Sequence, residues 1–229
     1  MNDQPRQFLG VDLGGTAIKL GRFDIEGELL AEFEMPTPRP SIPGAVAVAL
    51  CEAIDSLDPR HQASFVGVGL PGPMDFEGRV ARVCINLPGW NEVPLADWLE
   101  PRLERKVVLG NDGNCALLGE SWKGAARGYK DVLLLTLGTG VGGGVMLNGK
   151  LFTGHKGAAV EPGLIGINSQ GPRCQSGNSG SLQQYASVRG LHHLTDSEPE
   201  ELSARALSGD QEALQIWEAY GKNLGAGIS

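Results

Sequence analysis

Apolar residues along the chain gather into short runs that end at glycines or prolines. In the first half, strand-like runs are separated by turn signals, and two stretches carry apolar side chains at helical spacing. The expected elements of this half are strands over residues 8–13, 17–24, 28–35, 65–70 and 106–109, and helices over residues 45–57 and 95–103. This order of strands and helices predicts a mixed sheet covered by helices.

The second half repeats the start of this plan. After a helix expected over residues 115–126, the apolar run VLLLTL at 132–137 leads into the glycine-rich stretch 138–144, which we expect to form a turn. A strand over 145–147 and the pair Asn148-Gly149 follow, and Asn-Gly is the strongest short signal for a hairpin.

The recurrence of strand, glycine turn and strand indicates an internal repeat. We therefore predict an α/β fold of two actin-like, ribonuclease-H-like lobes with mixed sheets flanked by helices and a cleft between them. The N-terminal lobe would span residues 1–110 and the C-terminal lobe residues 111–229, and the facing lobes would bring both glycine turns to the cleft. Residues 212–224 carry an apolar helical face that needs a partner.

Charge and composition exclude several classes of protein. The net charge is −8 and no cluster of lysine or arginine appears, which argues against nucleic-acid binding. No apolar run reaches the ~18 residues of a membrane span, and the N-terminus lacks a signal-peptide pattern. The four cysteines stand far apart without a CxxC pair, as expected of reduced thiols. We expect a soluble, cytoplasmic protein.

The first glycine turn is a candidate phosphate site. Gly14 and Gly15 allow successive backbone N–H groups to converge on an anion, and the Thr16 hydroxyl adds a donor. Asp12 stands beside them at the end of a strand and is suited to hold a hydrated Mg²⁺, and Lys19 follows shortly after. The alternative is an ordinary Gly-Gly hairpin with an exposed carboxylate.

The second glycine stretch contains a formal GxGxxG pattern at Gly138, Gly140 and Gly143. A dinucleotide-binding site of this type requires a helix to begin there, whereas the residues that follow read as a strand and a hairpin. A glycine-rich turn that presents N–H groups to a nucleotide phosphate explains the pattern better than an NAD(P) site. Glycines that serve only sheet curvature are the structural alternative.

Asn111 and Asp112 lie between an expected strand and an expected helix. Asp112 is either a helix N-cap or a general base that accepts a hydroxyl proton during phosphoryl transfer. Asn86 and Glu161 are polar residues set in turns, and each fits an ordinary loop as well as a binding site.

Together these segments resemble the ROK family of repressors, open reading frames and kinases, within the actin-like ATPase and sugar kinase superfamily. The resemblance covers residues 8–191 and rests on six ordered motifs. They are DLGGT at 12–16, GVGLPGPMD at 67–75, NLPGW at 86–90, NDGN at 111–114, TLGTGVGGG at 136–144 and NGKLFTG at 148–154.

The resemblance implies a glucokinase-type kinase that phosphorylates a hexose with ATP and Mg²⁺, usually at the C6 hydroxyl, with Asp112 as the base. Glucose is the first candidate substrate. Sugar-binding positions are Gly72, Asn86, Asn111, Asp112 and Glu161. Nucleotide-binding positions are Asp12, Gly14, Gly15, Thr16, Lys19, Gly138, Thr139, Gly140, Gly142 and Gly143. A homodimer is expected as well.

The chain departs from the family pattern in the loop that usually binds zinc. Leu164 replaces a histidine, and Ser176 and Ser181 replace two cysteines, so that only Cys174 remains. One thiolate cannot form the four-ligand site of a structural zinc ion, and we expect no bound zinc. Leu164 and Gln183 also replace side chains that usually hold the sugar, which leaves the identity of the sugar open.

The family pattern also continues beyond Ser229, so the C-terminal lobe is expected to be incomplete. Either the chain is a fragment, or a partner covers the apolar face of its last helix. A non-catalytic sugar- or nucleotide-binding relative and an inactive truncated fragment are therefore the alternatives to a kinase. The repressors of the family carry an N-terminal helix-turn-helix, for which the residues before position 8 leave no room, and this argues against a DNA-binding role.

Overall fold

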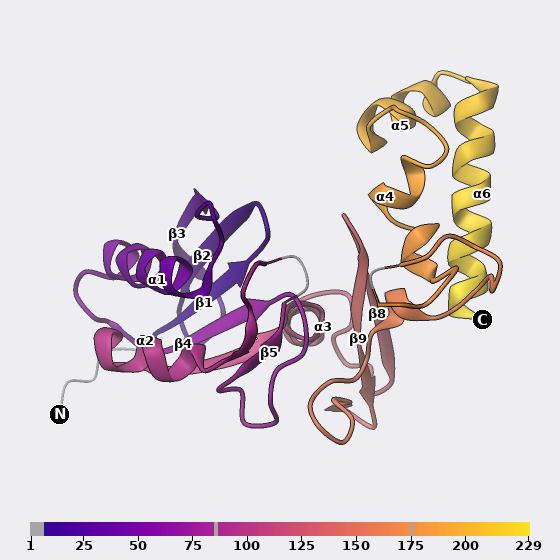
Figure 1. The fold of residues 1–229 in the computed structure, drawn as a ribbon. Helices are drawn as coiled ribbons and strands as arrows, with labels where there is room; N and C mark the ends of the chain where they lie inside the picture. The colour runs from indigo at the N-terminus through magenta and orange to yellow at the C-terminus, as the bar shows by residue number, and fades with distance from the viewer. Residues whose placement is uncertain (1–6, 85–86, 175) are drawn as a thin grey trace.

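The computed structural model describes residues 7–84, 87–174 and 176–229 (Figure 1). Its first half is built on a five-stranded sheet with the order β3-β2-β1-β4-β7. The strands are β1 (Gln7–Leu13), β2 (Ala17–Phe23), β3 (Leu29–Pro36), β4 (Ala63–Leu70) and β7 (Lys106–Asn111). β1, β2 and β3 are antiparallel, whereas β4 and β7 continue from β1 in parallel, so the sheet is mixed.

Two helices cover one face of this sheet, α1 (Pro43–Leu57) and α2 (Leu95–Leu103). Alternate residues of β1 point toward them, and Leu13 is fully buried there. α1 buries Leu50 and Ile54 completely in the same layer. The result is one continuous apolar core that spans the whole first half.

α3 (Asp112–Lys123) follows β7 directly and lies between the first sheet and a second, smaller one (Figure 1). The second sheet has the order β10-β9-β8 and is antiparallel. Its strands are β8 (Val132–Leu137), β9 (Val141–Leu147) and β10 (Lys150–Leu151). A separate hairpin, β5 (Ala81–Val83) with β6 (Asn91–Val93), lies between β4 and α2 in the chain.

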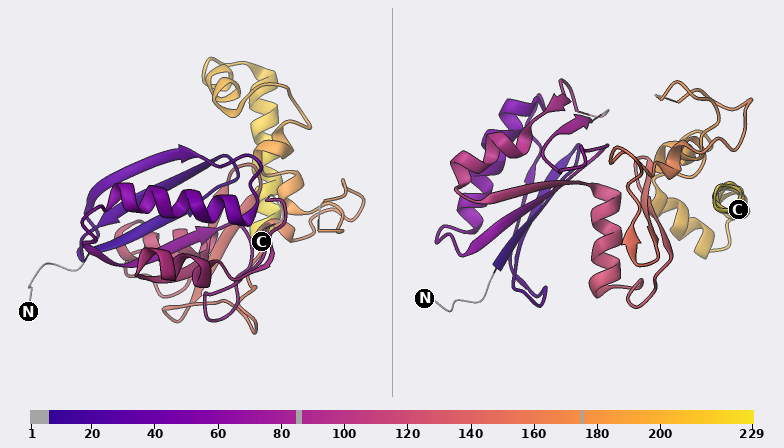
Figure 2. Two further views of the ribbon diagram at one scale, coloured as in Figure 1. Left: turned by 60° about the vertical axis from the view of Figure 1, so that its left-hand side comes forward. Right: turned by 90° about the horizontal axis from the view of Figure 1, so that it is seen from below.

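The remaining helices lie on the far side of the second sheet from the first (Figure 2). They are the 3-10 turns η1 (Pro162–Leu164) and η2 (Leu182–Gln184) and the helices α4 (Val188–Leu191), α5 (Pro199–Leu207) and α6 (Gln211–Ile228). Two small apolar clusters hold this region together. In the described part of the chain, no helix combines the length and the apolar character that crossing a membrane requires.

The sequence predicts most of these elements correctly, including both ends of α2 and β8. Asn148 and Gly149 both have positive φ, 53° and 73°, which confirms the tight hairpin between β9 and β10. Two expectations are wrong: α3 begins at residue 112 and ends at 123, and β9 begins at residue 141, within the supposed turn. The α/β fold with a helix-flanked mixed sheet is confirmed for the first sheet, whereas the second sheet is antiparallel in the described residues. The lobe boundary near residue 110 stays a prediction.

Candidate active site

The N-terminus of α3 is the centre of the site. Asn111 is the N-cap: its side-chain oxygen accepts from the backbone N–H of Asn114 at 3.0 Å. Its amide nitrogen donates to the carbonyl of Gly72 at 3.2 Å and so ties the loop after β4 to the helix. Asp112 is the first helical residue, which corrects its interpretation as the helix cap. Because Asn111 caps the helix, the Asp112 carboxylate bonds only locally, accepting from the N–H of Gly113 at 2.7 Å.

Asp112 shares this region with two further carboxylates, those of Asp12 and Glu161. Asp112 keeps an exposed surface, but the surrounding protein removes part of the solvation of its carboxylate. This desolvation is the largest cause of its raised pKa. The charge of Asp12, which stands exposed near the end of β1, raises the pKa of Asp112 further. Burial and then the charge of Asp112 raise the pKa of Glu161. The structure thus brings Asp12, Asp112 and Glu161 into one region, in which Asp112 and Glu161 hold protons more tightly than usual.

Two thiols lie within reach of the same charge. Burial, followed by the charge of Asp112, raises the pKa of Cys84 to about 12 and that of Cys115 to about 11. Both groups are therefore neutral thiols at neutral pH, and neither is an activated nucleophile. The carboxylates, not the thiols, are therefore the candidate proton acceptors of this region.

The first glycine turn differs from the predicted anion nest. The N–H of Gly14 donates to the carbonyl of Ala17 at 3.0 Å, and neither Gly14 nor Gly15 has positive φ. The N–H of Gly14 is therefore used within the turn, and anion binding by this turn stays a prediction. Thr16 is exposed at the tip of the turn. Arg39, which sequence reasoning missed, reaches the turn from the proline-rich connector and donates to the carbonyl of Gly15 at 3.3 Å.

Asp12 and Lys19 stand opposite each other on β1 and β2. Both are exposed, and both line a shallow pocket of about 370 Å³ on the outer face of the first sheet, the face away from α1. This places the predicted metal-binding carboxylate and the predicted lysine on one side of the first turn.

The second glycine stretch divides into a turn and a packed strand. Gly138 and Gly140 close the turn with a bond from the N–H of Gly138 to the carbonyl of Gly140 at 3.0 Å, and Thr139 between them is exposed. Gly142 and Gly143 belong to β9. A Cβ on Gly143 would lie 2.1 Å from the carbonyl oxygen of Leu134, so that glycine is needed for packing. The expectation of one continuous turn over residues 138–144 is therefore corrected.

Gly72 occupies a similarly restricted place. Its φ is +112°, and a Cβ there would lie 2.1 Å from the carbonyl oxygen of Val83 on β5. Glycine alone fits this position, between β5 and the side chain of Asn111. Asn86, which the resemblance places among the sugar-binding residues, lies outside the described residues.

The donor set fits a magnesium ion and does not fit zinc. Mg²⁺ prefers one or two carboxylates together with substrate phosphates and water, and the exposed carboxylate of Asp12 beside that of Asp112 offers such oxygens. The loop around Cys174 instead holds one thiol among hydroxyls, with its Sγ 2.7 Å from the Oγ of Ser176. Burial raises the pKa of Cys174, but polar contacts outweigh it, foremost the hydrogen bond with Ser176, and the pKa is lowered to about 7. Within the described ranges, no three histidine, cysteine or acidic side chains form a group that could hold a metal ion.

Comparison with known proteins identifies the family. The family model described as "ROK family" matches residues 8–229. The chain belongs to the ROK family. It is 38% identical over 188 residues to a glucokinase of Thermotoga maritima, and the match covers 82% of this chain and 59% of that protein. This ROK chain thus spans about three fifths of the length of that curated relative.

For two further relatives, the match covers a larger share of the relative's length. The chain is 36% identical over 230 residues to an N-acetyl-D-glucosamine kinase of Salmonella paratyphi A, a match that covers 93% of this chain and 75% of that protein. Among solved structures, a ROK family glucokinase from Streptomyces griseus in complex with glucose and AMPPNP superposes with a TM-score of 0.85 at 33% identity. That superposition covers 97% of this chain and 78% of the other.

Proposed function

We propose that this ROK chain catalyses the ATP-dependent phosphorylation of a hexose, of the glucokinase type, with Asp112 as the general base. The observation that carries the proposal is the position of Asp112. It stands at the first turn of α3, released from capping by Asn111, in a region shared with Asp12 and Glu161. Relatives that are glucokinases and an N-acetyl-D-glucosamine kinase support the same class of reaction.

In this mechanism the sugar hydroxyl, usually that at C6, attacks the γ-phosphorus of ATP. The bond from that phosphorus to the bridging oxygen of ADP breaks, and the carboxylate of Asp112 accepts the hydroxyl proton. The raised pKa of Asp112 makes it a better proton acceptor than an ordinary aspartate, provided that it is ionised at the working pH. Asn111, Gly72, Glu161 and Asn86 would bind and orient the sugar.

The nucleotide would bind next to the two glycine turns. Gly14, Gly15, Thr16 and Lys19 belong to the first turn and its strand, and Gly138, Thr139 and Gly140 form the second. The packing of Gly142 and Gly143 leaves them a supporting role there. Mg²⁺, held through water by Asp12, would neutralise charge on the phosphates when bound. We further propose that the protein is a cytoplasmic homodimer, which the family resemblance and the exposed apolar residues Leu214 and Ile228 of α6 support.

ADP release from Mg·ATP tests this function. We would measure it with glucose, mannose, fructose, N-acetylglucosamine and N-acetylmannosamine in turn. Release that depends on one of these sugars is the expected result, and it would also name the substrate. Release with none of them, together with sugar binding measured by calorimetry, would replace the kinase with a non-catalytic sugar-binding protein.

A further inference from the structure

The loop between β4 and β5 carries part of the candidate sugar site and is fixed at both ends. Near β4, the carbonyl of Gly72 accepts from Asn111. A few residues later, Met74 and Ala81 form an isolated antiparallel bridge that closes the loop. The loop also lies close against the second half, because a Cβ on Gly157 would lie 2.9 Å from the carbonyl oxygen of Met74.

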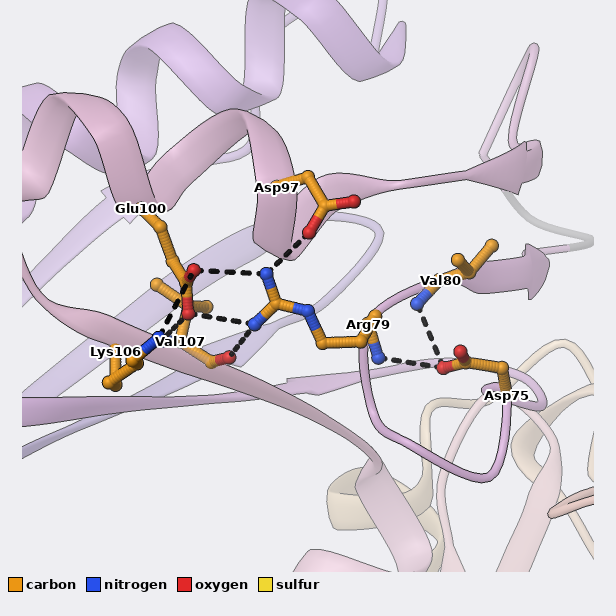
Figure 3. Close-up of polar contacts among 7 residues, drawn as sticks. All are labelled: Asp75, Arg79, Val80, Asp97, Glu100, Lys106 and Val107. Carbon is orange, nitrogen blue, oxygen red and sulfur yellow. Dashed lines mark hydrogen bonds and ion pairs between the residues drawn. The ribbon is translucent and has the colours of Figure 1, made fainter.

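Asp75 organises the tip of this loop (Figure 3). Its carboxylate accepts from the backbone N–H of Arg79 at 2.7 Å and from that of Val80 at 2.9 Å. The N–H of Gly78 donates to the carbonyl of Asp75, and the N–H of Leu109 on β7 donates to the carbonyl of Gly78 at 2.8 Å. The loop tip is therefore a closed turn that rests on β7.

The side chain of Arg79 ties that turn to two further elements. Its guanidinium makes two bonds to Glu100 of α2, at 2.7 and 3.0 Å, and a third to Asp97 of the same helix. It also donates to the carbonyl of Val107 on β7 at 3.1 Å, while Glu100 accepts from the N–H of Val107 at 3.0 Å. β7 ends at Asn111, the cap beside Asp112, four residues beyond Val107.

We propose that Arg79 is a positioning residue of the site. By holding the loop after β4 on α2 and β7, it keeps Gly72 against Asn111 and supports the segment that leads through Gly157 to Glu161. The inference rests on the proposed function, because sugar affinity is the property that this positioning would set.

The geometry requires an arginine at this position. A guanidinium matches the two oxygens of Glu100 with parallel bonds and still reaches Asp97 and a backbone carbonyl, which the single ammonium of a lysine cannot do. The pKa of Glu100 falls to about 2, first because of its bonds from Arg79 and then because of its bond from Val107. Since the Arg79 side chain is 27% exposed, its charge alone contributes little, and the directions of its bonds matter more.

The chain offers a closely matched control. Arg205 of α5 also bonds two carboxylates, those of Asp210 and Glu212, each at 2.8 Å, and is 31% exposed. It lies in the helical region beyond the second sheet, far from α2 and β7 along the fold (Figure 1). Arg205→Met therefore removes a similar network without touching the loop after β4.

Sugar KM, kcat, sugar affinity without ATP and amide hydrogen exchange of residues 71–84 should be compared for wild type, Arg79→Met, Arg79→Lys and Arg205→Met. We expect Arg79→Met to raise both KM and the sugar Kd about tenfold or more, with kcat changed less than about threefold and faster exchange in the loop. The KM, Kd and loop exchange of Arg79→Lys should lie between those of wild type and Arg79→Met. Those of Arg205→Met should match wild type.

A KM and a loop exchange rate for Arg79→Met equal to those of Arg205→Met would overturn the inference. If Arg79→Met fails to fold, the same comparison with Arg79→Lys decides. A wild type that neither binds nor turns over any sugar would refute the proposed function. In that case, faster loop exchange in Arg79→Met would still show that the contacts of Arg79 with α2 and β7 stabilise the loop, but these contacts would have no role in sugar affinity.

Discussion

The two sheets start from the same sequence signal and are buried very differently. In β1, Leu9 and Leu13 are 2% and 0% exposed, because β1 has a neighbour on each side and α1 above it. In β8, which is even more apolar, Leu133 and Leu137 are each 48% exposed. Within the described residues β8 pairs with β9 alone and forms an edge of its sheet. An apolar run thus predicts a strand, while its neighbours decide how much of it is buried.

The candidate chemistry lies where these two regions meet. Asp112 and its cap follow β7, the last strand of the well-packed half, and the helix that they begin packs on β9. A rigid first half would hold the sugar side of the site in place. The contrast in packing can be tested by matched substitutions.

The largest effect is expected from deleting buried side chains. Leu50→Ala should cost about 2–5 kcal/mol of unfolding free energy, because Leu50 is fully buried in the core of the first half. Leu133→Ala on β8 should cost less than about 1 kcal/mol, because half of that side chain already faces solvent. Denaturant titration of both variants measures the difference. Equal losses would show that the two halves are packed alike.

A second pair of substitutions tests how tightly α3 sits on the second sheet. A Cβ on Gly113 would lie 2.5 Å from the carbonyl oxygen of Gly143, so Gly113→Ala should destabilise by about 1–3 kcal/mol. Gly119 lies in the same helix with nothing within 4 Å of the new methyl group, and Gly119→Ala should stabilise by about 0.4–1 kcal/mol. Thermal unfolding distinguishes the two by sign, and a loss in both would contradict the close contact.

A third prediction concerns pH. Folding raises the pKa of Asp112, which means that the ionised carboxylate is less favourable in the folded protein than in the unfolded chain. Asp112→Asn should therefore raise stability at neutral pH, and this gain should vanish as the pH falls below the ordinary pKa of about 3.8, where both states are protonated. Thermal midpoints from pH 3 to 8 check the sign. A variant less stable than wild type at neutral pH would refute the raised pKa.

The smallest effect is expected from metal removal. Because the loop around Cys174 has a single thiol and carries serines at positions 176 and 181, a chelator such as EDTA should leave Tm unchanged. A Tm that falls with EDTA and recovers on adding Zn²⁺ would contradict this expectation.

The sequence predicts the first half best because its signals are local. The apolar runs of β1 and β4 and the helical spacing of α1 are visible without tertiary information. The three-residue strands β5 and β6 are too short to leave a periodic signal, and α5 begins at Pro199 without a strong cap residue before it. β9 is read as a turn because glycine is a weak strand former, although its glycines are closely packed: Gly144 lies against α3, and Gly143 lies against Leu134 of β8.

The residues of the site also differ in how well local sequence signals predict them. Asp112 and Asn111 stand out as polar residues between a strand and a helix, yet which of them caps α3 depends on one backbone position that the sequence leaves ambiguous. Arg39 and Arg79 are missed because their partners lie far away in the chain or on other elements. Asp75 and Gly78 signal the turn before Arg79, but no local pattern predicts its bonds to α2 and β7.

The most direct test of the account is a comparison of kcat and sugar affinity between wild type and Asp112→Asn, with the sugar that wild type phosphorylates. If Asp112 is the base, kcat should fall by roughly 10²–10⁴. The sugar Kd should stay within a few-fold, because the amide keeps the shape and the hydrogen-bonding oxygen of the carboxylate. Equal kcat in the variant would remove Asp112 from the chemistry and contradict the central claim.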